Sequence, residues 1–366
     1  MKIAVDCRMS GQSGIGAFID GILPYFLSSD NDFLIIFSNE NKDLSLTQRF
    51  NSEKKIEKVF CDTKIFTLKE LFNFPKEIVK KINSCDAYFS PYFNIPSKIK
   101  IPLYTTIHDV VFLDIPSLAG KTGTFLRKMF YKYAVKKSRE IFTVSNFSKE
   151  RIIKNLNCKK KINVVYSALP EFFNEKSADI QKDDSIIFIG NIKKHKGLST
   201  LIPAFAQFLK TIERDFKTRP KLVIIGSREN FKTADNSIES LLKTVPNDSI
   251  DFTGNISNSE LKEKLSKARF LVQPSLYEGF GLPPLQALYS NTNVILSDIE
   301  VFKEIYSDFP VTFFKTESVE DLAEKMIQMW NNPYEIKNIP EKHSFSKTAE
   351  KILSAIEENF TRNSRV

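Results

Sequence analysis

The chain has 366 residues, of which 42% are hydrophobic and 12% aromatic, with a formal net charge of +9. This length predicts two domains, and the apolar content is sufficient for a packed core in each. Its four cysteines form no Cys-x-x-Cys pair, which argues against a zinc or disulfide framework and favours a reducing compartment. The first residues lack the apolar run of a signal peptide, and the longest uncharged stretch, residues 279–297, contains two prolines and two glycines. Neither secretion nor a membrane-spanning helix is therefore expected.

Positive charge is concentrated in the first half of the chain. Residues 1–180 contain 28 Lys and Arg against 19 Asp and Glu, whereas residues 181–366 contain 25 of each. This asymmetry predicts a polyanionic or membrane-surface partner for one domain only.

Strand-like apolar runs alternate with helical patterns along the whole chain, which predicts parallel βαβ units. In the first half, strands are predicted at residues 2–6, 33–37, 57–61, 86–89, 102–107, 140–144 and 162–166. A second series is predicted at residues 185–190, 221–226, 250–253, 269–273, 293–296 and 310–314. The fold class is therefore α/β, with two Rossmann-like domains, residues 1–170 and 185–344, joined by a polar linker at 171–184.

Ligands bind beyond the carboxyl ends of the strands in such sheets, so the loops that follow strands hold the candidate site residues. Gly14 and Gly16 follow the first strand and open a helix that ends near Ser28, although a plain helix cap explains this Gly-x-Gly equally well. His108 follows the strand at 102–107, a position that favours a role in the site over a purely structural one.

The helix predicted at residues 121–139 is basic and aromatic. Lys128, Lys132 and Lys136 repeat at four-residue spacing, with Phe125 and other large side chains nearby. It either lies on anionic lipid headgroups or packs one face on a sheet, and the pattern leaves both open. No nucleic-acid recognition module accompanies it, so nucleic acid is not expected as a partner.

Two further short motifs are compatible with a role in the site but have simpler explanations. Asp30-Asn-Asp32 has the Asp-x-Asp spacing of metal-dependent transferases, but it suits a surface turn better. Ser145 follows a strand and could reach the site, although a helix N-cap explains it without function.

The loop at residues 190–197 follows the first strand of the second domain and is rich in lysine. Fixed cations there would lower the barrier for departure of a nucleoside diphosphate, because they meet the negative charge where it develops. A solvated basic loop is the alternative.

The stretch at residues 275–288 joins a buried strand to a helix start through a glycine loop. Pro283 and Pro284 suit a first helical turn, and the N–H groups of Gly281 and Leu282 would point from a helix N-terminus that favours phosphate. Glu278 lies at the mouth of this site.

The same stretch resembles the Glu-x7-Glu signature of the retaining, nucleotide-sugar-dependent glycosyltransferases of family 4, which have the GT-B fold. The resemblance implies that Glu278 binds hydroxyls of the donor sugar, and that Gln286 stands where a second glutamate normally holds the ribose. It also implies two domains that face each other across a deep cleft, and a final segment, residues 345–366, that crosses back to the first domain.

Further positions match the family's other motifs. Lys196 matches the lysine of the family's Arg-Lys-Asn/Gly element, His195 occupies its usual arginine position, and Asn191 stands where some members place another arginine. The resemblance implies catalytic roles for His108, Lys196 and Glu278. The donor-binding residues that it implies are Gly14, Gly16, Asn191, His195, Lys196, Glu278, Gly279, Phe280, Gly281, Leu282 and Gln286.

The expected activity is transfer of a hexose, with mannose from GDP-mannose as one donor that the resemblance suggests, to a saccharide or polyprenyl-linked acceptor in O-antigen or capsule synthesis. Neither a metal nor a cofactor is expected, and the expected location is cytoplasmic, at the inner face of the cell membrane. A GT-B nucleotide-sugar epimerase and a non-catalytic nucleotide-sugar-binding protein are the alternatives. Formation of an epimer from donor alone would indicate the first, and binding without turnover the second.

Overall fold

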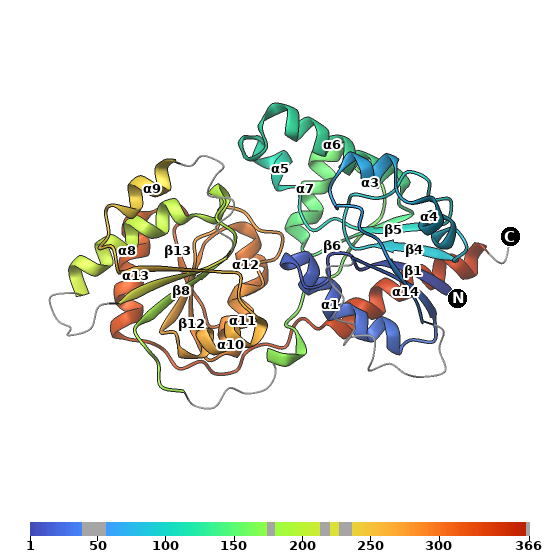
Figure 1. The fold of residues 1–366 in the computed structure, drawn as a ribbon. Coiled ribbons are helices and arrows are strands. Elements are labelled where there is room, and N and C mark those ends of the chain that lie inside the picture. Colours follow the sequence, from blue (N-terminus) through green and yellow to red (C-terminus); the bar gives the residue numbers. More distant parts are fainter. Residues whose placement is uncertain (39–55, 174–179, 213–219, 227–235, 364–366) are drawn as a thin grey trace. The chain divides into compact units, whose positions relative to one another are not determined.

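The structure, a computed structural model, describes residues 1–38, 56–173, 180–212, 220–226 and 236–363. The chain forms two compact units, Met1–Pro170 together with Lys342–Val366, and Glu171–Glu341. Each unit is built on a parallel sheet with helices packed against it (Figure 1). The predicted α/β class with two Rossmann-like domains is confirmed.

The first sheet has seven strands in the order β3-β2-β1-β4-β5-β6-β7, all paired in parallel. Its strands are β1 (Lys2–Asp6), β2 (Asp32–Phe37), β3 (Ile56–Phe60), β4 (Ala87–Ser90), β5 (Leu103–Thr106), β6 (Glu140–Thr143) and β7 (Ile162–Val164). The helices of this unit are α1 (Ser13–Ser28), α3 (Leu68–Phe72), α4 (Lys76–Ile82), α5 (Val111–Asp114), η2 (Pro116–Leu118), α6 (Gly120–Lys137), α7 (Asn146–Leu156) and α14 (Phe345–Asn363). Because strand order reverses beside β1, its switch point lies between β1 and β4.

The second sheet has six parallel strands in the order β10-β9-β8-β11-β12-β13, with its switch point between β8 and β11. Its strands are β8 (Ser185–Ile189), β9 (Lys221–Ile225), β10 (Ile250–Gly254), β11 (Phe270–Gln273), β12 (Asn293–Ser297) and β13 (Thr312–Phe314). The helices of this unit are η3 (Glu171–Phe173), η4 (Lys194–Lys196), α8 (Leu198–Ile212), α9 (Asn236–Leu242), α10 (Asn258–Lys267), α11 (Pro283–Tyr289), α12 (Glu300–Tyr306) and α13 (Val319–Asn331).

The central strands of each sheet, such as β4, β5, β11 and β12, are buried on both faces, which explains why they read as continuous apolar runs. In the first unit, Ala4 and Leu34 lie in one core cluster that also includes helix residues such as Ile82. In the second unit, the ring of Trp330 on α13 packs edge-on against Phe208 on α8, with centroids 5.4 Å apart.

The C-terminal helix α14 belongs to the first unit. Phe345 packs so closely over Gly21 of α1 that a Cβ at Gly21 would lie 2.2 Å from the Phe345 ring. Thr348 Oγ1 also donates to Tyr166 O at 2.6 Å, and Asn359 Nδ2 donates to Glu140 Oε1 at 2.9 Å. The segment expected to return to the first domain therefore packs there.

The structure describes only part of the predicted linker at 171–184, because residues 174–179 lie outside the described residues. Its first residues pack against the protein. Phe173 is buried, and Lys262 Nζ of α10 donates to Phe172 O at 2.7 Å, so this turn is packed on the second unit.

Candidate functional site

The loops after β8 and β11 meet at the switch point of the second sheet. Lys196 Nζ, in η4, lies 2.7 Å from Glu278 Oε1, and their side chains are 19% and 11% exposed. Gly197 ends η4 with φ +76°, and a Cβ there would lie 1.9 Å from Pro274 O. Glycine thus permits the close approach that brings the lysine and the carboxylate together.

A chain of hydrogen bonds also holds Glu278, through the same oxygen that Lys196 contacts. Ser275 Oγ donates to Glu278 Oε1 at 2.8 Å, and Gln273 Nε2 donates to Ser275 Oγ at 3.2 Å and to Ile189 O at 3.1 Å. Ser297 Oγ fixes the backbone of Ser275 by donating to its carbonyl oxygen at 2.5 Å. The carboxylate is therefore oriented by groups at the ends of three neighbouring strands, β8, β11 and β12.

Sequence reasoning did not identify Gln273 or Ser275 as site residues. A signal was present, since Gln273 is the polar end of an otherwise apolar buried strand, and both side chains are fully buried. A buried amide must find partners, so its position beside the loop indicated a role.

The glycine loop enters α11 as predicted, with Pro283 and Pro284 in the first turn. Gly281 has φ +83°, and a Cβ there would meet the Phe302 ring at 2.4 Å, so only glycine fits. The Tyr306 hydroxyl donates to Gly281 O and receives a backbone hydrogen bond from Leu285. Tyr306 thus occupies part of the helix start that was expected to face a phosphate.

The remaining loop residues differ in accessibility. Gly279 and Phe280 are buried, whereas Gly281 and Leu282 are partly exposed, so the latter two are the ones a ligand can reach directly. Gln286 lies in the first turn of α11 and is 8% exposed. Its expected contact with a ribose stays a prediction.

His195 differs in charge from the arginine whose position it occupies. Burial, and after it the neighbouring Lys196, lowers the pKa of His195 to about 4. At neutral pH the imidazole is therefore uncharged and cannot supply the positive charge of the arginine whose position it occupies. Its Nδ1 is buried with no hydrogen-bond partner among the described residues. Asn191 is half-buried, and Lys194 is exposed in the same loop.

In the first unit, His108 lies after β5 with its ring edge-on to Phe18, at a centroid distance of 5.0 Å. Its Nε2 lies 2.9 Å from Pro91 O. A carbonyl oxygen only accepts, so Nε2 carries the proton and Nδ1 keeps a lone pair. Burial lowers the pKa of His108 to about 4, so this ring is a neutral acceptor at pH 7. Such a group can accept a hydrogen bond from a sugar hydroxyl.

Gly14 and Gly16 both lie in the first turn of α1 but differ in the space available for a side chain. A Cβ at Gly16 would lie 2.4 Å from Met9 O, whereas a Cβ at Gly14 would meet nothing within 4 Å. Gly16 is thus explained by packing, and Gly14 borders open space. Ser145 caps α7 by accepting from Ser148 N at 3.0 Å, which accounts for it structurally.

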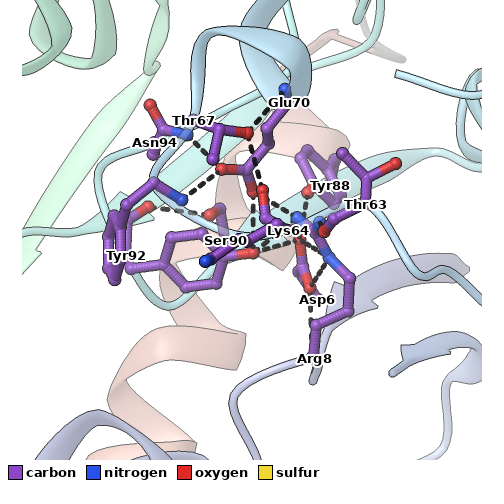
Figure 2. Close-up of polar contacts among 11 residues, drawn as sticks. Asp6, Arg8, Thr63, Lys64, Thr67, Glu70, Tyr88, Ser90, Tyr92 and Asn94 are labelled. Atoms are coloured by element: carbon purple, nitrogen blue, oxygen red, sulfur yellow. Dashed lines mark hydrogen bonds and ion pairs between the residues drawn. The ribbon is translucent and has the colours of Figure 1, made fainter. Parts of the chain in front are cut away.

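The switch point of the first sheet is filled by protein instead. Arg8 is 2% exposed and donates to both carboxylate oxygens of Asp6, with Nη2 2.7 Å from Oδ2 (Figure 2). The same Nη2 donates to Glu70 Oε1 at 2.5 Å and to the Tyr92 hydroxyl at 2.6 Å. Asn94 donates to the second oxygen of Glu70.

This buried network has unusual electrostatics. Burial raises the pKa of Glu70 to about 7, although Arg8 opposes the shift. Burial also acts to raise the pKa of Asp6, but Arg8 more than offsets this and holds it below its ordinary value. Since Arg8 is committed to these partners, we assign the network a structural role and place the candidate donor site in the second unit.

Part of the chain matches a known family model. Residues 171–352 match the family model described as glycosyl transferases group 1. Over these residues the chain carries a glycosyl transferases group 1 domain.

Three similar proteins of known sequence are named as glycosyltransferases. The O-antigen chain mannosyltransferase RfbU of Salmonella typhimurium is 29% identical over 211 residues, which are 56% of this chain and 54% of the relative. An uncharacterized glycosyltransferase of Methanocaldococcus jannaschii, MJ1178, is 28% identical over 65% of this chain and 61% of its own. O-antigen chain mannosyltransferase B of Escherichia coli is 23% identical over 60% and 59%. The chain thus spans little more than half the length of these curated relatives.

Solved structures show the same fold along the whole chain. Sucrose-phosphate synthase from Thermosynechococcus elongatus has a TM-score of 0.67 at 14% identity, covering 100% of this chain and 98% of that one. HepE from Anabaena, solved in complex with UDP-glucose, has a TM-score of 0.68 at 12% identity, covering 98% and 100%. The predicted GT-B fold is confirmed. No helix in the described part of the chain is both long enough and apolar enough to cross a membrane.

Proposed function

We propose that this protein is a retaining glycosyltransferase that moves a hexose from a nucleoside diphosphate sugar to a saccharide or lipid-linked oligosaccharide acceptor in surface polysaccharide synthesis. The observation that carries the proposal is the Lys196–Glu278 pair, held at the switch point of a glycosyl transferases group 1 domain. No metal or other cofactor is part of the proposal.

The pair divides the chemistry between its two members. The Lys196 ammonium can meet the negative charge that develops on the diphosphate as the glycosidic bond breaks, and a charge held in place needs little reorganisation during the reaction. The Glu278 carboxylate accepts hydrogen bonds only, so it suits the hydroxyls of a sugar. Without ligand the two neutralise each other, and a bound diphosphate would draw Lys196 towards itself.

His108, in the first unit, is part of the proposal as a neutral hydrogen-bond acceptor for a sugar hydroxyl. Gly281 and Leu282 would offer N–H groups to the diphosphate, and Gln286 would face the ribose. Retention of configuration follows, in this proposal, from attack by the acceptor on the face that the diphosphate leaves.

Mannose is the donor sugar we propose, because two of the similar proteins are named as O-antigen chain mannosyltransferases. GDP-mannose is therefore the first donor to test, with UDP-glucose, which the solved HepE structure contains, as its comparison. All four cysteines are free and buried, which supports a cytoplasmic location. A peripheral position at the inner face of the cell membrane belongs to the same proposal.

Donor binding and donor turnover test the proposal in turn. A thermal-shift panel of GDP, UDP, dTDP and ADP sugars should single out one donor, since ligand at 100 times its Kd stabilises the folded state by about 2.7 kcal/mol. That donor should then release nucleoside diphosphate and transfer its sugar, with the anomeric configuration kept in the product. Conversion of donor into an epimer without acceptor would contradict the proposal, as would binding with no turnover in the presence of acceptor extracts.

A further inference from the structure

Helix α6 has two faces with different surroundings. Phe130, Tyr131 and Ala134 are buried in the first unit, so the helix is packed on that side. On the other side Phe125 is 66% exposed and Met129 is 52% exposed. Residues four apart are neighbours on a helix surface, so Phe125 and Met129 form one outward apolar strip. The predicted packing of one face is therefore confirmed, and the outward face is the one to which the other interpretation, contact with lipid headgroups, applies.

The outward face is also uniformly basic. Lys121, Lys128, Lys132 and Lys136 are exposed, and no Asp or Glu occurs between Gly120 and Lys137. At 3.6 residues per turn, these lysines share the face of Phe125 and Met129, along one side of the apolar strip and between its two side chains. A helix with this arrangement suits an anionic interface, where lysines meet charged headgroups and large apolar side chains enter the acyl boundary.

We propose that α6 docks the first unit on an anionic lipid surface. Phe125 and Met129 enter the interface, and the four lysines bind the headgroups. A nucleic acid would attract the lysines equally but would leave the apolar strip in water, so the exposed Phe125 and Met129 favour lipid. The proposal rests on the peripheral location put forward above, and it supplies the surface that makes that contact.

Sedimentation of the full-length protein with phosphatidylcholine vesicles, with and without phosphatidylglycerol, tests this docking. Binding is expected only to vesicles that contain phosphatidylglycerol, and added salt should weaken it. Each lysine near such a surface contributes a factor of roughly five in partitioning, so the double change Lys128→Glu and Lys132→Glu should weaken binding by at least about 25-fold.

A second set of substitutions in the same experiment tests the apolar strip, with a matched control. Phe125→Ser with Met129→Ser should weaken binding by about tenfold or more, since membrane affinity scales with the apolar area buried. Phe360 on α14 is 40% exposed but lies beside Glu357 and Glu358, so Phe360→Ser should leave binding unchanged.

Three results would overturn the proposal: absence of wild-type binding, equal binding by the serine variant, or equally weakened binding by Phe360→Ser. Retention of the wild-type thermal midpoint shows that each variant is folded. Tight binding of a single-stranded oligonucleotide, unaffected by the serine changes, would identify nucleic acid as the partner instead. Vesicle binding needs no nucleotide sugar, so failure here is distinguishable from failure of glycosyl transfer.

Discussion

Replacement of Arg8 by methionine should destabilise the first unit alone. Arg8 is 2% exposed and holds the two buried carboxylates of Asp6 and Glu70 (Figure 2). Removing one partner of a buried ion pair leaves an uncompensated charge and costs about 3–5 kcal/mol, a large part of the stability of an ordinary domain. With a urea m-value of about 2 kcal/mol/M, the unfolding midpoint should fall by roughly 2 M.

The chain contains a separate probe for each unit. All four cysteines are buried in the first unit, whereas the single tryptophan, Trp330, is buried in the second. Reaction of the thiols with 4,4′-dithiodipyridine during urea titration therefore follows the first unit, and tryptophan fluorescence follows the second. Arg8→Met should shift the thiol midpoint and leave the fluorescence midpoint in place.

A surface ion pair provides the matched control. Lys81 lies 2.8 Å from Glu57, and their side chains are 49% and 37% exposed. Exposed pairs contribute about 0–1 kcal/mol, so Lys81→Met should move the thiol midpoint by less than about 0.5 M. If Arg8→Met behaves like Lys81→Met, or if both probes shift together, the buried network does not stabilise the first unit as argued.

Three further predictions concern pH, the hydrogen-bond chain and the ribose contact. The folded-state pKa of Glu70 is raised to about 7, so the stability that Glu70 contributes is lost as pH rises from about 4.5 to 7. The pKa of His108 is lowered to about 4, so the stability that His108 contributes is gained as pH rises from about 4 to 6.5. Thiol-monitored unfolding should therefore show stability rising with pH in Glu70→Gln and falling with pH in His108→Asn, and parallel pH profiles would exclude both assignments. Ser275→Ala should lower kcat by roughly tenfold with the fold intact, since one hydrogen bond that orients Glu278 is lost. Ser275→Thr should retain part of the rate. Equal rates for both variants in donor turnover would remove Ser275 from the site. Gln286→Leu should weaken nucleotide binding in calorimetry by about 1–3 kcal/mol while Gln286→Glu preserves it, and the reverse order would mean that the side chain only fills the core.

The parallel strands could be predicted because a strand buried on both faces is a continuous apolar run bounded by polar residues. Strands such as 185–190 and 269–273 were found in this way, and the structure has them as β8 and β11. The loops that follow them could also be located, because ligand sites in such sheets lie at the carboxyl ends of strands.

Contacts between residues far apart in the sequence could not be predicted. Glu70 is 62 residues from Arg8, and neither carries a motif that pairs them, so the closed network at the first switch point was not foreseen. The neutral state of His195 also depends on burial that only the folded loop creates. Gln273 and Ser275 act through hydrogen bonds whose partners are fixed by strand order, which sequence spacing alone does not give.

The central claim, that Lys196 stabilises the departing diphosphate, is tested most directly by release of nucleoside diphosphate from the donor that the thermal-shift panel selects. Lys196→Ala should lower kcat by roughly 10² or more, the scale of losing one preorganised charge at a developing anion. Lys194, exposed in the same loop, gives the control, and Lys194→Ala should keep the wild-type rate. A Lys196→Ala enzyme that turns over at the wild-type rate, while Glu278→Ala is also fully active, would contradict the proposed site.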